Sequence, residues 1–337
     1  MRLVQLSGPS GRRVALVEEP SLRFLRTPSS VYELAQQAIV EQIPVTTLVQ
    51  QSLSDERIPY DPVYDGSSDW RLLPPIDVPG DAHRVLVAGT GLTHYGSARD
   101  RQNMHLSTIT AEQEAQMTDS MRMFEWGRQH GRPAQGGIGI APEWFYKGSG
   151  SVLRAHNQPL DIPGYAEDGG EEAEIAAIYV NGPDGTPFRV GMCNGNEFSD
   201  HVFERRNYLN LAGSKLRTCS IGPELVIDPA FTDVPGTVRI LRNGSVLWHK
   251  DIRTGEANMC HSLANLEHHH FKFEGHRLPG QVHVHFMGAD TLSFGEQVHL
   301  QSGDVTEVQF DGFGRALRNT IAAHHPLASA VAVKTLQ

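Results

Sequence analysis

The chain has 337 residues, with 29 Lys and Arg against 39 Asp and Glu, which gives a formal net charge of −10. This length suits one large domain with a smaller one, and an acidic chain without a block of Lys or Arg lacks the positive surface that nucleic acid or an anionic membrane would require. The three cysteines are too few and too scattered for a disulfide framework, and no apolar run reaches membrane-spanning length, so we expect a cytoplasmic protein.

The first 80 residues are predicted to form a small N-terminal α/β lobe. Two short strands, MRLVQL and RRVALVEE, flank a GPSG turn. Ser29 or Ser30 is expected to cap a helix over 31–42, where apolar residues recur at helical spacing. A Pro-rich stretch at 72–81 indicates a domain boundary, so we divide the chain into a lobe of residues 1–80 and a larger domain of residues 81–337.

The larger domain is predicted to be mostly β. Residues 84–92, RVLVAGTGL, have the pattern of a strand, and residues 110–129 carry the longest helical pattern, with Thr108 or Thr110 as its cap. From residue 135 onward we expect only strands and turns, with hairpin turns at NGPDG and RNGS. The predicted fold class is therefore α+β, mostly β. The GTG at 89–91 lacks the further glycine of a dinucleotide-binding loop, which argues against a nucleotide site.

Two glutamates stand where an apolar strand begins, in GGEEAEIAAIYV at 169–180. Glu172 and Glu174 are two residues apart, so on a strand they point to one face. Two carboxylates on one apolar face repel each other, and a cation is the simplest remedy; oxygen ligands favour Mg²⁺, Mn²⁺ or Ca²⁺ over zinc. On spacing alone, a solvated strand edge is the more common outcome.

Collinear motifs around this pair resemble those of the fumarylacetoacetate hydrolase superfamily. In order they are PEWFYKGS, the E-x-E of Glu172 and Glu174, GNEFSD, GSKLRTCSIGPEL, and LQSGDVTEV with GFGRALRN, and they cover roughly residues 84–322. The resemblance implies a mixed β-roll that holds one divalent metal ion on three carboxylates. It implies Mg²⁺, with Mn²⁺ or Ca²⁺ as alternatives, on Glu172, Glu174 and Glu197. The third ligand of this motif is usually Asp, so Asp200 is kept as an alternative to Glu197.

The same resemblance implies further site residues. Lys215 matches the lysine of the G-x-K block and is expected to hold the substrate carboxylate or stabilise an enolate. Lys147 and Ser149 match the F-x-K-x-S block and are expected to bind substrate. The usual alternative for either lysine is a solvated surface position. Asp304, in SGDVTEV, is expected to be a structural turn residue.

One segment departs from the carbon–carbon hydrolases of this superfamily. Those members carry a stretch like G-L-N-Y-x-x-H-A, whose histidine helps to activate water, whereas the present chain reads GLTHYGSA and places Ser97 at that position. Ser97 is therefore grouped with the substrate-binding residues. His94 is the candidate general base, and either His94 or His105 could replace the missing histidine.

The chain resembles the branch of this superfamily that dehydrates 2-keto-3-deoxy sugar acids, because the segments GTGLTHYGSARDRQNMH and HSLANLEHHHF fit that branch better than the acylpyruvate hydrolases. The expected reaction is metal-dependent elimination of the C4 hydroxyl, which would convert 2-keto-3-deoxypentonate to 2,5-dioxopentanoate. A diketo-acid or acylpyruvate C–C hydrolase on the same metal site is the alternative enzyme, and a sugar-acid-binding protein without activity is the alternative of another class. By analogy we expect a homodimer or higher homo-oligomer, with a small 2-keto acid as its ligand.

A histidine-rich segment raises a second metal hypothesis. His283 and His285 are two residues apart in QVHVHF, as in a two-histidine metal platform of the cupin kind. The glutamate that such a platform needs a few residues later is missing, so we treat this as a minor alternative.

Overall fold

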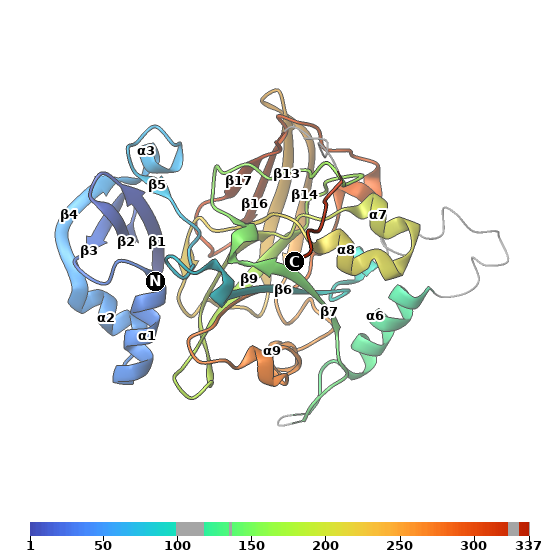
Figure 1. The fold of residues 1–337 in the computed structure, drawn as a ribbon, viewed down its shortest axis with the longest axis horizontal. Coiled ribbons are helices and arrows are strands. Elements are labelled where there is room, and N and C mark those ends of the chain that lie inside the picture. Colours follow the sequence, from blue (N-terminus) through green and yellow to red (C-terminus); the bar gives the residue numbers. More distant parts are fainter. Residues whose placement is uncertain (99–117, 135–136, 323–329, 337) are drawn as a thin grey trace.

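Two β-sheets form the framework of the protein (Figure 1). The computed structural model describes residues 1–98, 118–134, 137–322 and 330–336. In these ranges, the larger sheet follows the order β4-β3-β2-β1-β12-β10-β9-β15-β6-β7, with β5, β8 and β11 attached beside it. The smaller sheet has the order β14-β13-β16-β17.

The strand and helix bounds are as follows. The strands are β1 (Arg2–Gly8), β2 (Gly11–Glu18), β3 (Ser21–Leu25), β4 (Leu53–Pro59), β5 (Arg71–Leu72), β6 (Val85–Gly91), β7 (Glu143–Ser149), β8 (Leu153–Arg154), β9 (Ala173–Asn181), β10 (Pro187–Asn196), β11 (Cys219–Ile221), β12 (Leu225–Val226), β13 (Val234–Arg242), β14 (Ser245–Thr254), β15 (Val282–Phe286), β16 (Val305–Phe310) and β17 (Leu317–Thr320). The helices are α1 (Val31–Glu41), α2 (Val45–Ser52), α3 (Tyr60–Tyr64), α6 (Asp119–His130), α7 (His201–Arg206), α8 (Leu211–Lys215) and α9 (Leu263–Phe271).

Strand β9 lies at the centre of the molecule and is buried along its whole length. On one face Ala176 and Ile178 join a core that also contains Leu34 of α1 and Val284 of β15. On the other face the alternate residues join a second core shared with β13, β14, β16 and α9. Both faces of β9 are therefore covered, which explains its nearly continuous apolar sequence.

The N-terminal lobe lies at one end of the molecule, on the left in Figure 1. Strands β1 to β4 form an antiparallel meander at one end of the larger sheet. Strand β1 joins this meander to the rest of the sheet by pairing Arg2 with Val226 of β12. Its own core lies under α3 and includes Phe24 and Tyr60, whereas α1 packs on the core of the larger domain. The lobe is thus joined to the rest by both a sheet and a shared core, and the boundary near residue 80 stays a prediction.

Several predicted elements are confirmed. Helix α1 begins after Ser30, whose side chain accepts a hydrogen bond from the Glu33 amide. The turns GPSG, NGPDG and RNGS connect β1 to β2, β9 to β10 and β13 to β14. In RNGS both Asn243 and Gly244 have positive φ, of 52° and 77°, as a two-residue hairpin turn requires.

One prediction about helices is confirmed in part and another is wrong. Within the helical pattern of residues 110–129, the structure shows α6 from Asp119 on, because Thr118 is extended (φ −65°, ψ 162°) and its side chain caps that helix. The positions before 118, with the proposed caps Thr108 and Thr110, lie outside the described residues. The expectation of only strands and turns after residue 135 fails at α7, α8 and α9. Helix α9 is capped by Ser262 and buries Leu263, Leu266 and His270, a helical spacing that the histidine run obscured.

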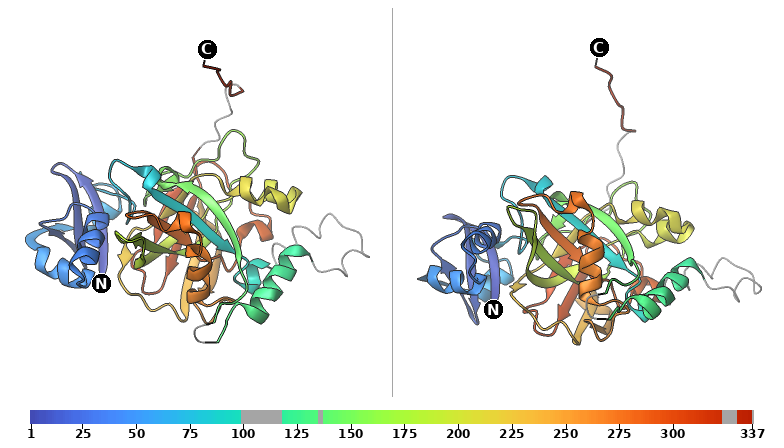
Figure 2. Two further views of the ribbon diagram at one scale, coloured as in Figure 1. Left: turned by 60° about the horizontal axis from the view of Figure 1, so that its bottom comes forward. Right: turned by 90° about the horizontal axis from the view of Figure 1, so that it is seen from below.

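Figure 2 shows α9 over the middle of the sheets and α6 toward the end of the molecule opposite the N-terminal lobe. In the part of the chain that the structure describes, no helix is both long and apolar enough to cross a bilayer.

Candidate metal centre

One β-hairpin carries three carboxylates to the same place. Strands β9 and β10 are antiparallel, with Glu174 opposite Gly195, so the start of β9 lies beside the end of β10. Glu172 immediately precedes β9, Glu197 immediately follows β10, and the Glu197 amide donates to the Glu172 carbonyl at 3.0 Å. Each of Glu172, Glu174 and Glu197 offers one carboxylate oxygen to a group whose members lie within 4.8 Å of one another. All three side chains are buried.

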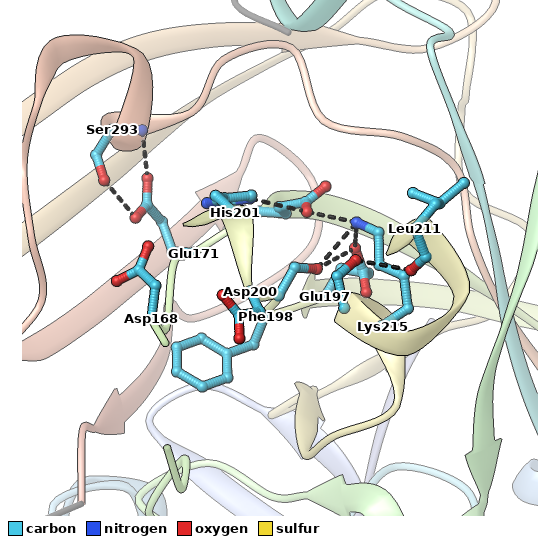
Figure 3. Close-up of polar contacts among 12 residues, drawn as sticks. Asp168, Glu171, Glu197, Phe198, Asp200, His201, Leu211, Lys215 and Ser293 are labelled. Atoms are coloured by element: carbon cyan, nitrogen blue, oxygen red, sulfur yellow. Dashed lines mark hydrogen bonds and ion pairs between the residues drawn. The ribbon is translucent and has the colours of Figure 1, made fainter. Parts of the chain in front are cut away.

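Two buried lysines reach this cluster. Lys215, at the end of α8, donates from Nζ to Glu172 Oε1 at 2.5 Å and to Glu197 Oε2 at 2.5 Å (Figure 3). Lys147, on β7, has its Nζ 2.6 Å from Glu197 Oε1 and donates to the Phe198 carbonyl at 2.8 Å. Neither lysine is a solvated surface residue, since both are 0% exposed. The centre is a buried network of three carboxylates and two ammonium groups.

The alternation of β7 explains how Lys147 enters the network. Glu143, Phe145 and Lys147 are buried, whereas Tyr146 between them is exposed. These three side chains therefore share the inner face of the strand. The Lys215 ammonium lies over the Phe145 ring, 4.7 Å from its centroid. Strand β7 thus supplies one wall of the centre.

Burial and neighbouring charges shift the pKa values of ionisable groups in this centre. Burial, and then the charges of Glu197 and Glu172, raise the pKa of Glu174 well above its usual range. Burial lowers the pKa of Lys147, although the charge of Glu197 opposes the shift. Burial also disfavours a charged His201, but its hydrogen bond to Glu172 Oε1, at 3.1 Å, and the charge of Glu172 raise the pKa of the ring.

The donor set fits a hard divalent cation. Three carboxylate oxygens within reach of one another match the ligand preference of Mg²⁺ and Ca²⁺, and the described residues of the group include no sulfur or imidazole ligand that would favour zinc. The Lys215 ammonium bridges Glu172 and Glu197 and so supplies positive charge between two buried carboxylates, which stabilises them.

Other predicted site residues lie outside this network. Both ring nitrogens of His94 are within hydrogen-bonding distance of threonines, Thr93 at 2.8 Å and Thr254 at 3.1 Å, and burial lowers its pKa to about 4. Ser97 Oγ donates to the His94 carbonyl at 3.2 Å. Ser149, the last residue of β7, is half-buried, and its Oγ lies 2.9 Å from Ser151 Oγ. His105 lies outside the described residues.

Asp200 has a structural position instead of that of a ligand. It caps α7 by accepting from the Phe203 amide at 2.9 Å, and its other oxygen pairs with Arg217 at 3.1 Å. It is not part of the acidic group that Glu197 completes, so the alternative to Glu197 is not supported. Asp304 follows the turn at Gly303 and pairs with Arg242 at 2.8 Å, which is the structural role expected of it.

The two strand histidines do not form a metal platform. His283 Nδ1 lies 2.9 Å from His270 Nε2, and His285 Nε2 lies 2.6 Å from Thr90 Oγ1. Both rings lie beneath α9, where burial lowers the pKa of each to about 3. Within the described ranges, the three glutamates are the one cluster with metal-ligand geometry, so the cupin-like alternative is not supported.

Sequence reasoning missed several groups at the centre. His201 contacts Glu172, Ser199 Oγ donates to Glu197 Oε2 at 2.9 Å, and the Gly288 amide donates to Glu174 Oε2 at 2.6 Å. Ser199 and His201 follow Glu197 directly in GNEFSDH, so proximity in the sequence could have indicated them. Gly288 arrives from a distant segment and left no local signal.

Neither a protein-family model nor a curated protein matches this sequence. Among solved structures, the chain is similar to 2-keto-3-deoxy-D-arabinonate dehydratase in its apo form, with a TM-score of 0.69, 16% identity, and coverage of 96% of this chain and 100% of that one. A structure of that dehydratase with magnesium and 2,5-dioxopentanoate gives a TM-score of 0.69 at 16% identity, covering 97% and 100%.

A second kind of enzyme shares the architecture. The 5-carboxymethyl-2-hydroxymuconate delta-isomerase from Mycobacterium smegmatis matches with a TM-score of 0.59 and 18% identity, covering 97% of this chain and 100% of that one. At these identities the likeness establishes the arrangement of the chain and not its reaction. The chain therefore has the fold of these dehydratase and isomerase structures.

Proposed function

We propose that this chain is a divalent-metal-dependent hydro-lyase of the fumarylacetoacetate hydrolase superfamily that removes the C4 hydroxyl of a 2-keto-3-deoxy sugar acid. The observation that carries the proposal is the buried group of Glu172, Glu174 and Glu197 with Lys215 bridging two of its members. The similar dehydratase structure holds magnesium and 2,5-dioxopentanoate, which supports a pentonate as the substrate here. Magnesium is the proposed cofactor.

The charges of the centre suit an anionic chelating ligand. The three carboxylates and the ammonium groups of Lys147 and Lys215 together carry one negative charge when all are ionised. A divalent ion would change this to one positive charge, and a 2-keto acid with a single carboxylate would neutralise it. Charge matching in a buried site favours such a ligand over a neutral sugar.

A divalent ion on the three glutamates would polarise the 2-keto group of the substrate and make its C3 hydrogens more acidic. In this proposal Lys215 stabilises the enolate oxygen or the substrate carboxylate. The burial of its ammonium beside two of the three proposed ligands supports that role. Loss of the C3 proton and departure of hydroxide from C4 form the double bond. Tautomerisation of a pentonate product then yields 2,5-dioxopentanoate.

Glu143 is a better-placed candidate for the general base than His94. It shares the inner face of β7 with Phe145, whose ring contacts Lys215, and its Oε1 accepts from Tyr208 at 2.8 Å. A carboxylate so buried can serve as a proton acceptor from carbon. His94, by contrast, has both ring nitrogens next to threonine hydroxyls.

The alternative C–C hydrolase would need a base that activates water. The residue at the corresponding position, Ser97, donates to a backbone carbonyl and has no imidazole to offer. This favours dehydration over hydrolysis on the same metal site.

Mass spectrometry of a panel of 2-keto-3-deoxy acids separates the functions. Purified protein with Mg²⁺ is incubated with pentonates and hexonates of each C4 configuration, beside an EDTA-treated sample. We expect a metal-dependent loss of about 18 mass units, one water. Release of pyruvate from an acylpyruvate would support the hydrolase instead. Binding of the acids without turnover would support a binding protein.

A further inference from the structure

Both carboxylate oxygens of Glu197 have polar or charged partners. Its Oε1 faces the Lys147 ammonium, and its Oε2 accepts from Lys215 and from Ser199 Oγ. Glu197 stands where the resemblance led us to expect Asp, so it carries one more rotatable bond than the usual ligand. A longer carboxylate needs more contacts to keep one orientation, because each freely rotating bond that is fixed costs conformational entropy.

The backbone next to Glu197 also binds Lys147. Phe198 is a non-glycine residue with a φ of 49°, a conformation that bulky side chains rarely adopt without support. Its carbonyl accepts from Lys147 Nζ at 2.8 Å, so Lys147 is bound to the side chain of one residue and to the backbone of the next. Lys147 is also fully buried.

We propose that Lys147 is a positioning residue that fixes the Glu197 carboxylate for a divalent metal ion, in place of the substrate contact that the sequence resemblance implied. This inference rests on the proposed metal centre. It assigns the two lysines different tasks: Lys215 bridges Glu172 and Glu197, whereas Lys147 pairs with Glu197 and with the backbone carbonyl of Phe198.

Whether the loss of Lys147 weakens or strengthens metal binding distinguishes a positioning role from a purely electrostatic one. Removing a positive charge beside a cation site would, through Coulomb repulsion alone, tighten metal binding. Loss of a hydrogen-bonded partner that orients a ligand weakens metal binding, by about 10–100-fold for such outer groups. Positioning by Lys147 therefore predicts weaker binding where charge alone predicts stronger binding.

The test is a Mn²⁺ titration of EDTA-stripped full-length protein, followed by the paramagnetic resonance signal of free Mn²⁺. We expect Lys147→Met to bind Mn²⁺ about 10–100-fold more weakly than the wild type. The matched control is Lys250→Met, which removes an exposed lysine that also pairs with a glutamate, Glu296, at 2.6 Å, and should leave the affinity unchanged. Because Lys147 would act through Glu197, its effect should shrink in a Glu197→Asp background.

Mn²⁺ affinity of folded Lys147→Met equal to or above that of the wild type would overturn the inference, as would an unchanged effect in the Glu197→Asp background. If Lys147→Met does not fold, Lys147→Gln, which keeps a polar donor, takes its place with the same expected direction. Wild-type protein that binds Mn²⁺ but dehydrates no sugar acid refutes the proposed function alone. Wild-type protein that binds no Mn²⁺ refutes both.

Discussion

Replacing Lys215 with Met removes the charge at the centre of the proposed site while keeping most of the stem volume. The ammonium contacts Glu172 and Glu197, each at 2.5 Å, and also lies over the Phe145 ring. In metal-free protein the change leaves two buried carboxylates without their bridging cation. Breaking a buried ion pair in this way typically costs about 3–5 kcal/mol of unfolding free energy. A bound divalent ion supplies the missing positive charge, so Mg²⁺ should recover much of this loss.

Activity should not recover with Mg²⁺. If Lys215 stabilises the developing enolate, we expect kcat/KM to fall by about 10²–10³, the effect of removing one oxyanion donor. Metal affinity should hold or rise, because the ammonium no longer competes with the ion for Glu172 and Glu197. The assay is steady-state dehydration at saturating Mg²⁺, with thermal unfolding measured in EDTA and in Mg²⁺. Near wild-type turnover of the folded variant would refute the catalytic role of Lys215.

Three further results are expected. Burial and neighbouring carboxylates raise the pKa of Glu174, so in metal-free protein its contribution to stability should be complete below the usual Glu pKa and be lost as the pH rises through the raised value. Glu174→Gln should remove this part of the pH dependence of Tm, and an unchanged profile would contradict it. Glu143→Gln should lower kcat by about 10²–10⁴ and His94→Asn far less; the reverse ranking would restore His94 as the base. Glu224 is buried, pairs with Arg2 at 2.9 Å and accepts from the Tyr60 hydroxyl at 3.1 Å, and it thereby joins the lobe to the larger domain. Glu224→Leu should therefore destabilise the protein by about 3 kcal/mol in urea unfolding, whereas a change within error would show that the lobe does not depend on it.

The shared orientation of Glu172 and Glu174 could be predicted from the sequence, because it depends only on their spacing along a strand. Glu172 and Glu174 lie on one face because side chains on a strand alternate, whatever the rest of the fold does. The closeness of Glu197 to Glu172 was predicted only from the collinear motifs, since the two residues are 25 positions apart in the sequence. In the structure, the β9–β10 hairpin with its NGPDG turn brings them together.

What could not be predicted depends on distant contacts and on competing local signals. The pairing of Lys147 with Glu197 joins residues 50 positions apart. From composition alone, Lys147 and Lys215 could equally well be exposed surface residues. His94 looked like a base because histidine titrates near neutrality, but the threonines that flank its ring come from its own segment and from β14. The helix break at Thr118 was hidden because Thr is compatible with both a helix interior and a cap.

The placement of all three proposed ligands on one hairpin has a consequence for how this protein can change in evolution. The carboxylates lie at the open end of the β9–β10 hairpin, and the turn over 182–186 lies at the other end. Residues added to or lost from that turn would leave the pairing near the carboxylates intact. An odd insertion within β9 between Glu174 and the turn would turn Glu172 and Glu174 toward the opposite face, where the second apolar core lies. Length variation in a lineage that keeps the metal centre should therefore collect in the turn, and a lineage with an odd change in β9 should have lost the centre altogether.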